Sequence, residues 1–165
     1  MDGQRLLRHL LASRRTTRAA FSERVLGAIE AAIRASETLH QGEIRFAIEG
    51  ALHPLDIWRG VTPAARARRV FAELNVWDTE HNNGVLIHVL TADRAVEIVA
   101  DRGFAQRVDA AEWSAACRAM ETEFSQGRHL EGAVAGIAAV GRIIARHFPP
   151  GESNPNELAD RPVVL

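Results

Sequence analysis

The residues best suited to chemistry lie in a polar loop just before an apolar segment. The loop, residues 75–83, is rich in carboxylates and amides, and residues 84–91 have the sequence Gly-Val-Leu-Ile-His-Val-Leu-Thr. Carboxylate and amide oxygens are hard ligands, and calcium takes about six to eight of them. Softer metals require sulfur or several imidazoles, and the loop has only His81. The loop therefore favours a hard divalent cation, calcium first and magnesium as the alternative.

Further acidic residues should reach the same place if the strands run as the pattern indicates. Residues 43–49 alternate apolar and polar side chains, which is typical of a half-exposed strand. Residues 95–100 follow 84–91 too closely for anything but an antiparallel hairpin. If 43–49 runs parallel to 84–91, the start of both strands and the end of the third meet at one edge of the sheet. The predicted metal site therefore comprises Asp78, Glu80, Asn82, Asn83, Asp101 and Glu43.

A second polar group is expected at the opposite edge, about 20 Å away at roughly 3.3 Å per strand residue. Asp93 and Arg94 form the hairpin turn, and Glu49, His53 and Asp56 follow the first strand. The carboxyl ends of parallel strands are the usual ligand side of open α/β sheets. A turn with an exposed charge pair is nevertheless the favoured interpretation of Asp93 and Arg94. The secondary candidate site is Asp93, Arg94, Glu49 and Asp56.

Other reactive residue types are better explained as structure. Cys117 shares one apolar helical face with Trp113 and Met120, which favours a place in the core. His88 lies inside the most apolar strand, as a hydrogen-bonded core histidine does. The serines lack the Gly-x-Ser-x-Gly turn of hydrolases, and no glycine-rich phosphate loop is present. The sequence thus indicates neither a nucleotide nor a covalent nucleophile.

Helices must hold these strands from both sides. A helical pattern opens at Phe21 and Ser22, with Ser22 as the expected cap, and runs to residue 41. Thr62-Pro63 starts a second helix, and further helices are predicted over 109–126 and 130–148, with a loop over 50–61. The order helix, strand, helix, strand, strand, helix, helix predicts an α/β fold, a three-layer α/β/α sandwich with a short mixed β-sheet.

Length and charge set the organisation of the chain. The 165 residues suit one folded domain, predicted over 21–148, between a basic N-terminal segment, 1–20, and a flexible C-terminal tail, 149–165. A net charge of −1 provides no field that would gather nucleic acid, so no nucleic-acid partner is expected.

The N-terminal segment determines the expected location. It lacks the apolar stretch of about seven to fifteen residues that a signal peptide needs, and no run approaches the roughly twenty apolar residues of a membrane span. The sequence therefore predicts a cytoplasmic protein whose N-terminal leucines cover the core. The alternative is peripheral contact with an anionic membrane at its inner face, through Arg5, Arg8, Arg14, Arg15 and Arg18.

The central segment, residues 76–87, resembles the TPM domain family. Its members carry an acidic loop ending in Asp-Asn-Gly, a Val-Leu-Leu strand, an Asp-Arg hairpin and a strand ending in Gly-Tyr-Gly. In this chain the matching residues are Asp78, Asn83-Gly84 and Asp93-Arg94, and the resemblance extends over roughly residues 21–148.

Two positions depart from the family pattern. Asn82 replaces the aspartate of Asp-Asn-Gly, which removes one formal charge, and Asp101 replaces the first glycine of Gly-Tyr-Gly, which adds one. Either the two changes compensate each other inside one site, or the site has decayed in this chain.

The resemblance implies several functions. Members are often described as acid phosphatases, others resemble calcium-binding proteins, and many are secreted or membrane-anchored and help to maintain membrane complexes. The leading hypothesis is therefore an accessory protein that binds calcium through the acidic loop and acts through a protein partner at or near a membrane. The alternatives are a metal-assisted acid phosphatase and a scaffold with a decayed site.

Overall fold

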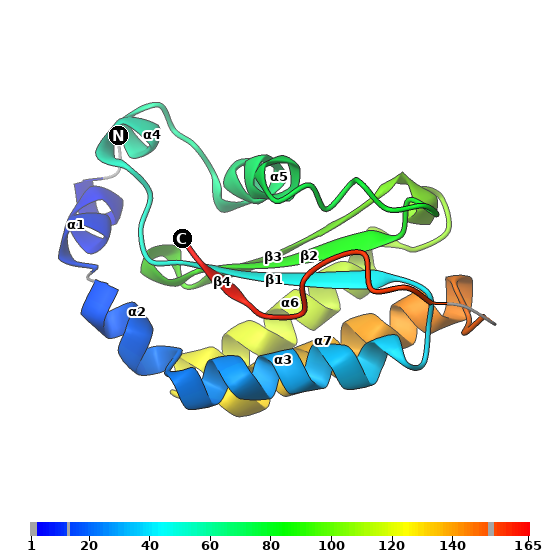
Figure 1. Cartoon of the computed structure of the whole chain (residues 1–165). Helices are drawn as coiled ribbons and strands as arrows, with labels where there is room; N and C mark the ends of the chain where they lie inside the picture. Colours follow the sequence, from blue (N-terminus) through cyan, green and yellow to red (C-terminus); the bar gives the residue numbers. More distant parts are fainter. Residues whose placement is uncertain (1–2, 13, 152–153) are drawn as a thin grey trace.

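Four strands form one mixed sheet in the middle of the structure (Figure 1). The computed structural model describes residues 3–12, 14–151 and 154–165. The sheet has the order β3-β2-β1-β4, with β1 (Glu43–Glu49), β2 (Gly84–Leu90), β3 (Ala95–Ala100) and β4 (Val163–Val164). β1 and β2 pair in parallel, whereas β2 and β3 are antiparallel. The predicted α/β fold with its mixed sheet is confirmed, including the parallel central pair.

Three helices cover one face of the sheet: α3 (Glu23–Glu37), α6 (Ala110–Ser125) and α7 (His129–His147) (Figure 1). Since strand side chains alternate, every second residue of β1 and β2 points into this layer. Ser22 stands at the N-cap of α3, as predicted, although within the described chain its side chain makes no capping hydrogen bond. The main core includes Ile29, Ile33, Ile44, Phe46, Val85, Ile87, Met120 and Ile137.

The other face is covered by α5 (Pro63–Glu73). Thr62 Oγ1 accepts a hydrogen bond from the backbone N–H of Ala65, and proline occupies the first turn, as the sequence predicts. Val70 of this helix packs with Ala47 and Leu86 of the sheet. Helices on both faces bury β2 along its whole length, which explains its continuous apolar sequence.

Three short helices gather at the carboxyl end of β1: α1 (Gly3–Leu11), α2 (Arg14–Ala20) and α4 (Pro54–Trp58) (Figure 1). The prediction of a loop over 50–61 is wrong for α4. His53 caps this helix, because its Nδ1 accepts a hydrogen bond from the Leu55 N–H, and Pro54 fits the first helical position. Single-turn 3-10 helices follow β2 and β3, η1 (Thr91–Asp93) and η2 (Arg102–Phe104).

The C-terminal segment joins the sheet. β4 pairs in parallel with β1, Ala47 opposite Val163, and the Leu165 N–H donates to the Ile48 carbonyl at 2.9 Å. The Arg45 guanidinium donates to the carbonyls of Ala159 and Arg161. The expectation of a flexible tail is corrected here, because the segment supplies the edge strand beside β1.

The close contact between α6 and α7 depends on two glycines of α7, Gly132 and Gly136. A Cβ added at Gly136 would lie 2.2 Å from Met120 Sδ and 2.4 Å from its Cγ. Met120 is fully buried, so it has little room to move. The small residues therefore set the distance between these helices.

Gly136→Ala should lower the free energy of unfolding by about 1–2 kcal/mol, because overpacking outweighs the gain in helix propensity. Gly27→Ala is the matched control: Gly27 also lies in a helix, α3, and a Cβ there meets nothing within 4 Å. The control should raise stability by up to about 1 kcal/mol. Chemical denaturation of both variants measures the difference, and equal effects would contradict the packing argument.

Candidate functional site

The parallel register brings the predicted metal residues to one edge of the sheet. Glu43 pairs with Gly84, so β1 and β2 begin side by side. The Asp101 N–H donates to the Gly84 carbonyl at 2.9 Å, and the Gly103 N–H donates to the Asn82 carbonyl at 2.9 Å. The loop before β2 and the turn after β3 are thereby joined through their backbones. We call this side of the sheet the amino edge.

The loop before β2 is shaped by its own backbone. Asn82 adopts a left-handed conformation with φ of 53°, which asparagine tolerates better than most residues. Thr79 Oγ1 accepts a hydrogen bond from the Asn83 N–H at 3.1 Å. A Cβ at Gly84 would lie 2.0 Å from the Val76 carbonyl oxygen, so only glycine fits there. The Asn-Gly pair therefore has a structural role whatever else the loop does.

Two oxygens at the amino edge are buried without a hydrogen-bond partner among the described residues: Asn83 Oδ1 and Asp101 Oδ2. The amide nitrogen of Asn83 donates to the Gln41 carbonyl at 2.7 Å, which fixes the side chain. Asp101 Oδ1 accepts from the Arg102 N–H at 2.7 Å. A buried oxygen without a partner costs free energy and needs an explanation, such as a water or an ion.

Two of the remaining predicted ligands, Asp78 and Glu80, face solvent. They therefore add negative charge at the rim of the edge. Asn82 Oδ1 accepts from Arg102 Nε at 2.7 Å. A guanidinium thus occupies one of the predicted oxygen ligands and places a positive charge beside the others.

Glu43 binds the C-terminal segment instead of pointing to a shared site. It is buried, and its Oε2 accepts hydrogen bonds from the Glu157 and Leu158 N–H groups of the C-terminal segment, at 3.2 and 3.0 Å. Burial raises the pKa of Glu43 above its ordinary value despite these hydrogen bonds. Within the described parts of the chain, no group of three or more His, Cys, Asp or Glu side chains is arranged to share a metal ion.

The structure adds two carboxylates that sequence reasoning missed, Glu37 and Asp160. Glu37 Oε1 accepts from the Ile44 N–H at 2.8 Å, and burial raises the pKa of Glu37 to about 8, with further contributions from Glu43 and Asp160. Asp160 is buried and meets Arg34 at 3.2 Å. No local sequence pattern predicts this cluster, since Asp160 lies in the C-terminal segment that the sequence analysis interprets as a flexible tail.

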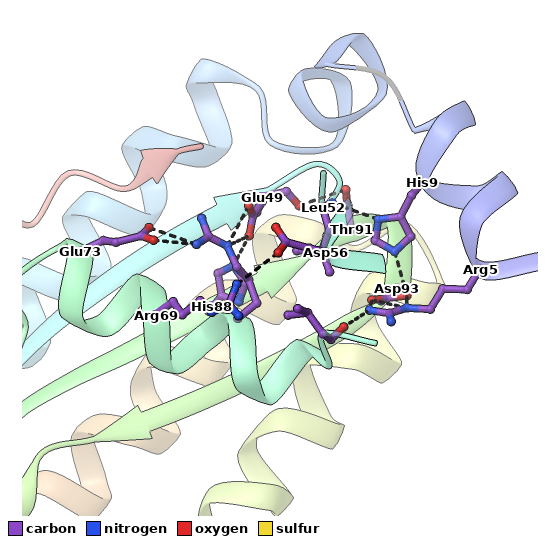
Figure 2. Close-up of polar contacts among 12 residues, drawn as sticks. Arg5, His9, Glu49, Leu52, Asp56, Arg69, Glu73, His88, Thr91 and Asp93 are labelled. Carbon is purple, nitrogen blue, oxygen red and sulfur yellow. Dashed lines mark hydrogen bonds and ion pairs between the residues drawn. The ribbon is translucent and has the colours of Figure 1, made fainter. Parts of the chain in front are cut away.

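The secondary candidate residues lie at the opposite edge, in separate pairings (Figure 2). Glu49 Oε2 lies 3.1 Å from His88 Nε2 and 2.9 Å from Arg66 Nε. Burial alone would raise the pKa of Glu49, but the hydrogen bonds from His88 and Arg66 outweigh it and lower the pKa. Asp56 pairs with Arg69 at 3.3 Å. The interpretation of His88 as a hydrogen-bonded core histidine is confirmed.

The side chain of Asp93 is only 7% exposed, so the predicted exposed charge pair is wrong for Asp93, whereas Arg94 is exposed. Arg5 donates to both carboxylate oxygens, with 2.7 Å from Nη2 to Oδ2 (Figure 2). His9 Nδ1 accepts from the Leu52 N–H, which leaves the proton on Nε2, 3.1 Å from Asp93 Oδ1. Burial alone would raise the pKa of Asp93, but the hydrogen bonds from Arg5 and His9 lower it. Asp93 therefore fastens α1 to the domain.

Arg94 lies outside this group and is exposed. It has φ of 53°, and it lines a cavity of about 740 Å³ together with Phe21, Arg118, Phe124 and His129. The four secondary candidates thus do not form one site. Cys117 packs against the core as expected, and burial raises the pKa of its thiol to about 12.

Glu37→Gln should change the pH dependence of stability. The pKa of Glu37 is about 8 in the folded protein and 4.5 ordinarily. Between these pH values the unfolded chain loses the Glu37 proton while the folded protein keeps it, so the free energy of unfolding falls as pH rises. Stability of the unmodified chain should fall by up to a few kcal/mol between about pH 5 and pH 8. The variant should show a clearly smaller fall in chemical denaturation, whereas the exposed Glu131→Gln should not. Parallel curves for all three proteins would contradict this assignment.

Asp93→Asn should loosen α1. Removing one partner leaves Arg5 half-paired and mostly buried, at a cost of roughly 2–4 kcal/mol. Hydrogen exchange of residues 3–11 should accelerate, while exchange in β1 and β2 stays slow. Unchanged protection of α1 would show that Leu6 and its apolar neighbours hold the helix without the ion pairs.

Comparison with known proteins gives the family. The TPM domain matches residues 16–143. The solution structure of the BA42 protein from the psychrophilic bacterium Bizionia argentinensis has a TM-score of 0.76 and 30% sequence identity, covering 87% of this chain and 94% of that one.

A second solved structure shares the fold. The N-terminal domain of the cg2496 protein from Corynebacterium glutamicum has a TM-score of 0.55 at 20% identity, covering 80% of this chain and 78% of that one. The comparison with curated proteins found no match. The family match spans most of the residues that build the sheet and its three-helix layer, and the chain belongs to the TPM domain family.

Proposed function

We propose that this TPM domain binds a divalent cation, calcium in the first place, at the amino edge of the sheet. We further propose that it acts through a protein partner at or near a membrane. The observation that carries the cation proposal is the buried oxygen Asp101 Oδ2, which has no partner among the described residues. A carboxylate in that position gains most from a cation or a tightly held water.

The donor set fits a hard cation. Asp101 and Asn83 contribute oxygens that the protein itself leaves unpaired within the described chain, and Asp78 and Glu80 are exposed on the adjoining loop. Glu43 is not among the proposed ligands, because the C-terminal segment already satisfies it. The remaining coordination positions of calcium would be filled by backbone carbonyls and water, as is usual for this ion.

Arg102 limits the cation affinity of the proposed site. Its guanidinium holds Asn82 Oδ1, so a cation that takes this oxygen must displace it or be repelled by it. Asp101, next to it in sequence, supplies the charge that Asn82 lacks. This pairing favours the interpretation of the two departures as a compensating exchange, with an affinity limited by the arginine.

Cation binding is preferred over phosphatase catalysis. A metal-assisted phosphatase needs positive groups that clamp the phosphate beside the ion. Arg45 is committed to the carbonyls of Ala159 and Arg161, which leaves Arg102 as the remaining arginine of the two near this edge.

A protein partner is supported by the side chain that precedes the loop acids. Trp77 is half exposed directly before Asp78, and aromatic side chains of this kind are enriched at protein interfaces. No helix in the described ranges is long and apolar enough to cross a membrane.

The test is calcium-dependent stability. At a hundredfold excess over Kd, calcium should raise the free energy of unfolding by roughly 2.7 kcal/mol. Asp101→Asn should remove most of this gain, because it removes the formal charge but keeps the capping acceptor. Asp109→Asn is the matched control, since Asp109 caps α6 in the same way away from the loop. Arg102→Gln should tighten calcium binding severalfold by removing the competing charge.

Two outcomes would contradict the proposal. One is the absence of any stabilisation by millimolar calcium or magnesium; the other is an equal effect of Asp101→Asn and Asp109→Asn. Phosphomonoester hydrolysis that falls with calcium affinity in the Asp101 variant would assign the phosphatase function instead.

A further inference from the structure

Helix α1 packs against the domain with its charged face inward. Arg5 and His9 point to the buried Asp93, and Arg5 Nη2 also donates to the Val61 carbonyl at 2.8 Å (Figure 2). A surface helix of a globular protein ordinarily turns its apolar stripe to the core and its charges to water. The polar contacts of α1 therefore take the side that apolar side chains normally occupy.

The leucines of α1 face outward as a consequence. Leu7, Leu10 and Leu11 are 56%, 62% and 72% exposed. Their spacing of three and four places them on one side of the helix. Leu6 alone among the leucines of α1 packs inward, against Leu52, Ile57 and Val61. The helix thus presents a leucine stripe to the outside.

The neighbouring helix α4 adds to this surface. α1 and α4 contact each other at one end of the molecule (Figure 1). Leu55 of α4 is more than half exposed, and Trp58 is 70% exposed. Five of the exposed large apolar side chains in the described residues thus belong to these two short helices, whereas the others are spread over the turn after α3, the loop before β2 and the C-terminus.

The charge around the stripe is mainly positive, since the acidic residue of α4, Asp56, pairs with Arg69. Neither α1 nor α2 contains an acidic residue. Arg8, Arg15, Arg18 and Arg59 are exposed on or beside these helices. The whole chain has a net charge of −1, so the positive charge is a local feature of this end.

We infer that α1 and α4 form a membrane-docking surface whose leucine stripe and Trp58 enter the interface of an anionic lipid bilayer. Leucine and tryptophan flanked by arginines are the composition of an interfacial helix, and each exposed arginine gains from anionic headgroups. The inference rests on the proposed action at a membrane, and it names the surface responsible.

The positive charge of this surface favours an anionic lipid bilayer over a second copy of the chain as its binding partner. In a two-fold dimer the same face meets itself, so the arginines of both copies would be brought together. An anionic bilayer instead compensates them while it buries the leucines. The ion pairs to Asp93 hold the stripe outward before contact, so the helix does not need to fold on the membrane.

The experiment is sedimentation of the full chain with lipid vesicles in the presence of a chelator, so that the result is independent of calcium. Vesicles of equal parts phosphatidylcholine and phosphatidylglycerol should bind the protein, and vesicles of phosphatidylcholine alone should bind it much more weakly. Binding should weaken as salt is raised, because screening reduces the attraction.

Matched variants locate the surface. The double substitution Leu10→Ser with Leu11→Ser should weaken binding at least roughly tenfold. Leu39→Ser removes a leucine of similar exposure, 64%, just beyond the C-terminal end of α3 and should leave binding unchanged. Arg15→Gln with Arg18→Gln should weaken binding roughly thirtyfold, whereas Arg142→Gln on α7 should have little effect. All substituted side chains are exposed, so unchanged melting temperatures confirm folding.

Several results would overturn the inference. They are equal binding to both vesicle types, an equal loss with Leu39→Ser, or a concentration-dependent dimer that the Leu10 and Leu11 substitutions abolish. Any of these, together with an intact calcium effect at Asp101, would remove the docking surface and leave the cation proposal standing. Loss of the calcium effect with intact vesicle binding would remove the cation proposal and leave the docking surface standing.

Discussion

The structure depends on the parallel pairing of β1 and β2. Its register places Glu43 opposite Gly84 and Glu49 opposite Leu90, so both strands begin at one edge and end at the other. A parallel pair requires a crossover, which α5 supplies, and the crossover returns through the polar loop that precedes Gly84. One pairing therefore creates both an acidic amino edge and a carboxyl edge to which α1 is attached.

The two edges differ in how their charges are compensated. At the amino edge burial raises the pKa values of Glu37 and Glu43, so negative charge there is costly without a positive partner. At the carboxyl edge hydrogen bonds outweigh burial and lower the pKa values of Glu49 and Asp93, so their arginine and histidine partners already stabilise these anions. The two edges therefore differ in which of their buried carboxylates are stabilised as anions.

Local signals made much of the fold predictable. Thr62-Pro63 marks a helix start by itself, the short spacing around Asp93 allows only a hairpin, and the apolar run of β2 requires cover on both faces. Features that depend on distant contacts were not predictable. Two residues of β4 have no periodicity, and the inward charged face of α1 makes sense only once Asp93 is known to be buried. The amino-edge site lies between these cases. Strand direction predicts that its residues lie at one edge, but it does not predict that Glu43 accepts hydrogen bonds from the C-terminal segment.

Binding of a divalent cation at the amino edge can be followed residue by residue in an NMR titration of the isotope-labelled full chain with calcium. We expect the largest shifts in amide resonances at Asn83, at Asp101 and along the loop from Asp78, with small changes at Glu49 and Asp93. Shifts that are absent, spread evenly over the chain or concentrated at the carboxyl edge would rule out a cation site at the amino edge.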